Sequence, residues 1–126
     1  MVGDLRAHGP DLRRAVQGYY DALDADDVEA VLEFFSGDVL YRRAGYEPMV
    51  GIDALRRYYE QTRLIAPGRH VLRTMVVEGA NVAAHGEWEG ELREGGRRSV
   101  GFAAFFVFDG NGRASEHTTY FFVPAV

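Results

Sequence analysis

Residues 70–123 decide the fold of this chain, and they read HVLRTMVVEGANVAAHGEWEGELREGGRRSVGFAAFFVFDGNGRASEHTTYFFV. Apolar side chains gather in four runs, which predict strands over residues 70–77, 81–92, 98–108 and 114–123. The three short segments between these runs are rich in glycine, which is typical of the turns that join antiparallel neighbours. The second half of the chain therefore predicts an antiparallel meander of four strands.

The segment before the meander has helical spacing instead. Apolar positions recur at intervals of three and four residues at Leu12, Ala15, Val16, Tyr19, Tyr20 and Leu23. Proline suits the first turn of a helix, so we expect this helix to begin at Pro10. Residues 1–9 are then a flexible N-terminus.

Two more helices and a strand are expected between the first helix and the meander. Asp26 and Glu29 have the spacing of a capping box, which predicts a short helix that extends to Phe35. A strand over residues 39–43 and a loop follow, and a third helix is expected from Asp53 to Arg63. Helices followed by strands indicate an α+β domain, with three N-terminal helices on one face of the sheet, over residues 10–126.

Composition excludes several classes of protein. The chain has 126 residues, a formal charge of −5 and no cysteine, so it has neither a disulfide framework nor a basic face for nucleic acid. The longest apolar run, residues 101–108, is too short to cross a membrane. We expect a cytoplasmic protein that uses no metal and no other cofactor.

Four stretches resemble the nuclear transport factor 2-like superfamily, and in particular its SnoaL-like and ketosteroid-isomerase-like branch. They are residues 16–27, VQGYYDALDADD, residues 32–39, LEFFSGDV, residues 48–59, PMVGIDALRRYY, and residues 106–113, FVFDGNGR. The resemblance implies a cone, in which a curved antiparallel sheet wraps the helices and the open end accepts a small apolar ligand. It also implies a homodimer that pairs through the outer face of the sheet.

The resemblance transfers only part of a known catalytic machinery. Ketosteroid isomerase uses an aspartate base, and an oxyanion hole made by a tyrosine and a protonated aspartate. The tyrosine corresponds to Tyr19, but the base falls on Arg43 and the protonated aspartate on Ala104. The chain should therefore not isomerise steroids by that mechanism.

Tyr19 and Arg43 each have two interpretations. Tyr19 is either a hydrogen-bond donor to a substrate oxygen or a core side chain that contributes only buried area. Arg43 stays charged and cannot act as a base, but it can bind a carboxylate or an enolate oxygen. Strand alternation places Val39, Tyr41 and Arg43 on one face, which the resemblance turns inward. The alternative is an Arg43 that lies at the rim, in solvent or beside a glutamate.

His117 is the best candidate for a base on this sequence. It lies in the last strand, on the same face as Ser115, Thr119 and Phe121. Histidine titrates near neutral pH, so His117 could accept or donate a proton inside the cone. The alternative is a satisfied histidine at the sheet surface or at a dimer interface.

The remaining candidates are the wall of the cone and two weaker sites. The expected substrate-binding wall consists of Phe35, Tyr41, Tyr58, Trp88, Phe102 and Phe121. His85 and Glu87 could touch one ion, but one such pair is a weak metal signal, and His8 and His70 have no companion. An epoxide-hydrolase activity requires a glutamate such as Glu87 to turn inward toward Arg43.

The resemblance leads to two hypotheses for function. The first is an enzyme that cyclises or isomerises an apolar carbonyl compound, such as a polyketide intermediate, through an enolate. His117 would move the proton, while Tyr19 and Arg43 would stabilise the enolate oxygen. The second is a non-catalytic protein that binds a small molecule, or an accessory dimer, built on the same cone. The phenylalanines of residues 102–108 cannot all face one interior, so either a second subunit or a thick core covers the rest.

Overall fold

The computed structural model describes residues 2–62, 68–92 and 94–122. The helices are α1 (Val2–Asp24), α2 (Val28–Glu33) and α3 (Ile52–Arg57), and α3 continues into a π-helical turn, η1 (Tyr58–Thr62). The strands are β1 (Phe35–Arg43), β2 (Met49–Val50), β3 (Arg69–Glu78), β4 (Asn81–Glu91), β5 (Arg97–Phe108) and β6 (Ala114–Phe121). This order confirms the α+β class. Among the described residues, no helix combines the length and the hydropathy that a membrane crossing requires.

The strands form one curved sheet in the order β2-β1-β6-β5-β4-β3. The four strands from β3 to β6 make the predicted antiparallel meander. The prediction of a wholly antiparallel sheet is wrong at one place, because β1 pairs with β6 in parallel. The side-chain period of a strand shows which residues share a face but not the direction of the neighbouring strand. The short strand β2, which lies in the predicted loop, pairs with β1 through Leu40 and Val50.

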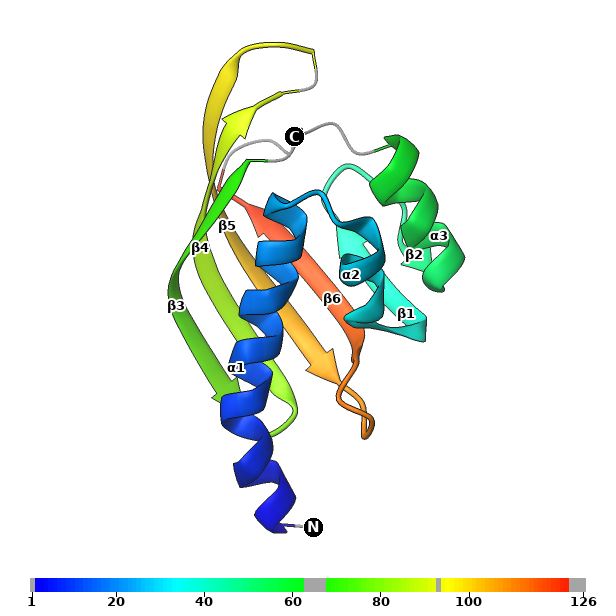
Figure 1. Ribbon diagram of the computed structural model, residues 1–126, viewed down its shortest axis with the longest axis vertical. Helices are drawn as coiled ribbons and strands as arrows, with labels where there is room; N and C mark the ends of the chain where they lie inside the picture. The colour runs from blue at the N-terminus through cyan, green and yellow to red at the C-terminus, as the bar shows by residue number, and fades with distance from the viewer. Residues whose placement is uncertain (1, 63–67, 93, 123–126) are drawn as a thin grey trace.

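Helix α1 lies across the concave face of this sheet (Figure 1). Its buried side chains confirm the predicted stripe and form much of the core: Leu12, Val16, Tyr19, Tyr20 and Leu23. The predicted start of the helix is wrong, because α1 begins at Val2 and contains Pro10 and most of residues 1–9. Proline has a fixed φ that is itself helical, so Pro10 does not mark a helix start by itself.

The boundaries of the other helices also differ from the predictions. Asp27, not Asp26, caps α2, because its Oδ1 accepts a hydrogen bond from the backbone N–H of Ala30 at 3.2 Å. Asp26 has a φ of 57°, a conformation that aspartate tolerates and that ends α1. Phe35 begins β1 instead of ending α2. The predicted end of the third helix at Arg63 and of the last strand at Val123 lie outside the described residues.

The predicted faces of the strands are confirmed. Val39, Tyr41 and Arg43 of β1 are buried on the inner face, as are His117 and Thr119 of β6. On β5 the faces divide as expected, since Phe102, Phe106 and Phe108 point inward while Phe105 is 48% exposed on the outer face.

Candidate functional site

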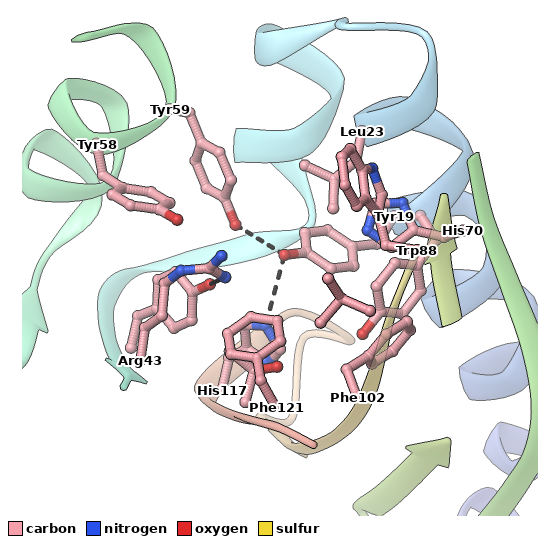
Figure 2. A pocket seen from close by; sticks show the side chains of 14 residues that line it. Tyr19, Leu23, Arg43, Tyr58, Tyr59, His70, Trp88, Phe102, His117 and Phe121 are labelled. Atoms are coloured by element: carbon pink, nitrogen blue, oxygen red, sulfur yellow. Dashed lines mark hydrogen bonds between the residues drawn. The ribbon is translucent and has the colours of Figure 1, made fainter. Parts of the chain in front are cut away.

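A small hollow lies between the helices and the inner face of the sheet (Figure 2). It encloses about 40 Å³, which is room for about three water molecules. Its walls come from α1, η1 and five of the strands: Tyr19, Tyr20, Leu23, Tyr41, Arg43, Tyr58, Tyr59, His70, Trp88, Val100, Phe102, His117, Thr119 and Phe121. The hollow is therefore largely aromatic, and its polar groups are five tyrosine hydroxyls, two histidines, Arg43, Thr119 and the indole N–H of Trp88.

Three of these side chains form a hydrogen-bonded row. The hydroxyl of Tyr59 lies 2.7 Å from that of Tyr19, and the Tyr19 hydroxyl lies 3.4 Å from Nε2 of His117 (Figure 2). The first bond is short, whereas the second is long for a hydrogen bond and is correspondingly weak. Tyr19 is therefore held mainly by Tyr59, and its contact with His117 is easily exchanged for a ligand.

His117 is a neutral imidazole with an assigned tautomer. Its Nδ1 lies 3.4 Å from the carbonyl oxygen of Phe105, and a carbonyl can only accept, so Nδ1 carries the proton and Nε2 is the acceptor. The pKa of His117 is lowered from 6.5 to about 3, because burial and the nearby charge of Arg43 together outweigh the hydrogen bond to Phe105, which raises it. A base works best when its pKa lies near the working pH, so His117 is a weak base at neutral pH.

Arg43 is buried beside the row, and its exposed fraction is 9%. Its Nη1 donates to the hydroxyl of Tyr41 at 3.1 Å, and its guanidinium lies 4.5 Å from the centre of the Phe121 ring. Burial alone lowers the pKa of Arg43, but the phenol oxygens of Tyr41 and Tyr58 raise it above its usual range. The guanidinium thus brings a permanent positive charge into an aromatic environment, where it also gains from cation–π contacts.

The structure brings most of the predicted wall to the hollow. Tyr41, Tyr58, Trp88, Phe102 and Phe121 all line it, whereas Phe35 is buried in the core against Tyr19 and does not. The Nε1 of Trp88 is buried and has no hydrogen-bond partner in the part of the chain that the structure describes. This indole N–H is a donor that a ligand could use.

Sequence reasoning missed two contributors to the site. Tyr59, which holds Tyr19, has the spacing of an ordinary core residue on the third helix. His70 was expected to have no companion, but its Nδ1 lies 2.6 Å from Oδ1 of Asp24. Both contacts join residues at least 40 positions apart, so no local pattern could have revealed them.

Glu87 does not enter the site. Its carboxylate pairs with Arg73 at 2.8 Å, and 41% of its side chain is exposed. The inward turn that an epoxide-hydrolase activity requires of Glu87 is therefore not met. Among the described residues, no group of three acidic, histidine or cysteine side chains could hold a metal ion.

A family model described as a SnoaL-like domain matches residues 16–117. No curated protein matches the chain significantly. The family match covers most of the chain, including the three residues predicted to carry the chemistry, Tyr19, Arg43 and His117.

Many solved structures share the fold. An LEH-like epoxide hydrolase of M. tuberculosis is 18% identical, with 90% of this chain and 84% of that chain covered and a TM-score of 0.78. The epoxide hydrolase/cyclase-like enzyme SalBIII, which has a role in pyran ring formation in the polyether salinomycin, is 18% identical. The match covers 89% of this chain and 91% of that chain, with a TM-score of 0.78. A putative SnoaL-like polyketide cyclase of Shewanella denitrificans is 14% identical, with 89% and 90% covered and a TM-score of 0.75. At these identities the likeness shows the fold alone.

Proposed function

The chain belongs to the SnoaL-like domain family, and from that premise we propose that it is a small cofactor-independent enzyme. Its reaction is acid–base chemistry, a cyclisation or isomerisation through an enolate, on an apolar compound that contains a carbonyl group. The observation that carries this proposal is the buried row of Tyr59, Tyr19 and His117 beside the guanidinium of Arg43.

The proposed chemistry uses Tyr19 and Arg43 on the oxygen of the substrate. When a proton leaves the carbon beside a carbonyl, negative charge develops on the carbonyl oxygen. The Tyr19 hydroxyl can exchange its long contact with His117 for this oxygen, while Tyr59 donates to Tyr19. The positive charge of Arg43 favours the same oxygen, and the aromatic walls strengthen both effects because they exclude water. The proton from the carbon passes to a histidine of the hollow.

The size of the hollow limits the substrate class. The polyketide cyclase and the polyether enzyme among the similar structures suggest a natural-product intermediate. A hollow of about 40 Å³ is much smaller than the ligand sites of several hundred Å³ that such molecules occupy. A compact carbonyl compound therefore fits the proposal better, and a larger one requires side chains such as Phe121 to move.

Binding of a phenolate tests the oxyanion side of the site, because a phenolate carries its charge on an oxygen beside a planar ring, as an enolate does. We expect 4-nitrophenolate, which is larger than the hollow, to bind with a shift of side chains such as Phe121, as followed by its absorbance. Arg43→Met and Tyr19→Phe should each weaken binding by about tenfold or more. His85→Gln, which changes an exposed histidine, is the control. Equal affinity in all four proteins would refute the proposal.

A second candidate is a non-catalytic protein that binds a small molecule or serves as an accessory subunit. Two observations favour it, namely the small hollow and the replacement of both expected aspartates, by Arg43 and Ala104. A protein of this kind would bind phenolate yet leave the carbon-bound protons of every enolisable ketone untouched.

We also propose that the protein is a homodimer that pairs through the outer face of the sheet. Phe105, Tyr120 and Val76 lie on this face and are 48%, 57% and 56% exposed. Exposed apolar side chains in a group are typical of a surface that another protein covers. Light scattering should give twice the mass of the chain, and Phe105→Glu should reduce it to one. A monomeric wild-type protein would contradict the proposal.

A further inference from the structure

A second proton-handling group lies in the wall of the hollow, apart from the row of Tyr59, Tyr19 and His117. Asp24, at the end of α1, accepts hydrogen bonds from the backbone and from the ring of His70, the second residue of β3. Its Oδ1 lies 2.6 Å from the ring Nδ1, and its Oδ2 accepts from the backbone N–H at 2.9 Å. Only 8% of the His70 side chain and 23% of the Asp24 side chain are exposed.

This contact fixes the role of each ring nitrogen of His70. A carboxylate only accepts hydrogen bonds, so Nδ1 of His70 carries a proton, and in the neutral ring Nε2 is the nitrogen with the lone pair. The ring packs against Tyr20 and Phe102, at 5.0 and 5.7 Å between ring centres, and lines the hollow. A carboxylate that holds an imidazole in one tautomer and stabilises its cation is a known way to build a base.

Resting on the proposed function, we propose that His70, oriented by Asp24, is the base that removes the proton from the substrate carbon. In Figure 2, His70 lies on one side of the labelled side chains, with Trp88 and Phe102, while Arg43 and Tyr59 lie on the other. The hollow between these walls has room for only about three water molecules. Tyr19 and His70 line the same small hollow, so a ligand whose oxygen contacts Tyr19 can present its neighbouring carbon to the wall that contains His70.

His117 is less suited to this role. Its ring is stacked between Phe106 and Tyr41, at 4.3 and 4.6 Å between ring centres, and its pKa is lowered to about 3. Its Nδ1 donates to a neutral carbonyl, which stabilises an imidazolium much less than the carboxylate of Asp24 does. The two histidines thus have different roles, because His117 contacts the Tyr19 hydroxyl until a ligand oxygen takes its place, and His70 exchanges the proton.

The proposed step is balanced without any other reactant. The C–H bond beside the carbonyl breaks, its proton goes to Nε2 of His70, and its electron pair forms the enolate. The enolate oxygen is stabilised by Tyr19 and Arg43, and the imidazolium of His70 is stabilised by Asp24. The proton then returns to the same carbon, which gives exchange with solvent, or to another carbon, which gives isomerisation.

Asp24 is a charged partner in direct contact with the ring of His70. Among the described residues, the side chains packed against His70 include Asp24 and Tyr20 of α1, Trp88 of β4 and Phe102 of β5. Asp24 is the charged member of this set, and Arg43 brings the positive charge of the opposite wall. Loss of the Asp24 charge therefore disfavours the imidazolium of His70.

The test is deuterium exchange at the carbons beside the carbonyl of 2-indanone in D₂O, followed by NMR. His70→Asn places an amide nitrogen where Nδ1 was, so it keeps a donor for Asp24 but removes Nε2. We expect this variant to lose exchange by about 100-fold or more. Phenolate binding should be retained, because Tyr19 and Arg43 are intact. His85→Gln is the matched control for loss of a histidine, and His70→Gln is the second variant if His70→Asn does not fold.

Asp24 is a positioning residue, so its test measures the pH dependence of the exchange rate, which would not change if Asp24 had only a structural role. Asp24→Asn keeps an acceptor for the backbone of His70 but removes the charge. We expect the exchange rate to fall by about tenfold or more, and its acidic limb to move to lower pH by about one unit. A lower rate with an unmoved limb would show that Asp24 only ties α1 to β3.

Two results would overturn the assignment of the base. If His70→Asn exchanges 2-indanone at the wild-type rate while His117→Phe does not, the base is His117, and the proposed function stands. If the wild-type protein binds phenolate but exchanges nothing, His70 is not a base, and the non-catalytic alternative is favoured. Absence of phenolate binding as well would refute the proposed function itself.

Discussion

The stability of the fold should depend on pH through His117. The ring is 2% exposed and neutral in the folded chain, where its pKa is lowered to about 3. In the unfolded chain, histidine has its ordinary pKa of about 6.5. Below pH 6.5 the unfolded state therefore binds a proton that the folded state does not bind. The free energy of unfolding is highest above pH 6.5 and falls as the pH is lowered toward 3.

The size of this effect follows from the difference between the two states. A pH of 5 lies about 1.5 units below the pKa of an unfolded histidine. Protonation at this pH stabilises the unfolded state, and so lowers the free energy of unfolding, by about 2 kcal/mol. This figure hardly depends on the exact folded pKa, provided that it lies well below 5. The loss should therefore be measurable although other groups also titrate in this range.

Urea unfolding at pH 7.5 and pH 5.0 measures the effect when wild type is compared with His117→Phe. The phenyl ring preserves the stacking on Phe106 and Tyr41 but cannot titrate. Between the two pH values the wild type should lose about 2 kcal/mol more than the variant, whatever the absolute cost of the substitution. His85→Gln is the control, since an exposed side chain meets water in both states. A difference below about 0.5 kcal/mol would refute a buried, neutral His117.

Substitutions at three further positions test the packing and the local contacts of the fold. Phe106→Ala should lower the free energy of unfolding by about 3–5 kcal/mol, because the ring is 1% exposed and leaves a cavity, whereas Phe106→Leu should cost less than half of that in the same urea titration. Asp27→Ala removes the cap of α2 and should cost about 1 kcal/mol in chemical unfolding, and an unchanged midpoint would contradict the capping role. Tyr59→Phe removes the 2.7 Å bond to Tyr19 and should cost about 1 kcal/mol, with weaker phenolate binding as the second readout.

Local patterns were sufficient to predict most of the fold. The two-residue period of β1, β4, β5 and β6 assigned their buried faces correctly, because burial on one side of a sheet imposes that period directly on the sequence. The helix boundaries were less predictable. Asp26 and Asp27 are adjacent and chemically identical, and only the backbone conformation shows which one caps α2.

The residues of the candidate site that lie on β1 and β6 could be predicted, because strand alternation decides which side chains share a face. Alternation grouped Arg43 with Tyr41 and His117 with Thr119, the family resemblance turned these faces inward, and both residues are buried. The contacts of Tyr59 with Tyr19 and of His70 with Asp24 depend on how η1 and β3 pack against α1. Such contacts follow from the tertiary arrangement, which neither periodicity nor composition describes.

The replacement of the expected base by Arg43 has a consequence for the whole site. An arginine at the end of β1 brings positive charge to the wall where a carboxylate would otherwise accept a proton, so this wall favours negative oxygen and repels a protonated base. His117, which lies near Arg43, is affected in this way, since that charge lowers its pKa. A base in this hollow is better placed on the opposite wall beside a negative charge, and Asp24 supplies that charge to His70. The same substitution that removes the usual base thus makes the Asp24 and His70 pair the most favourable place for a new one.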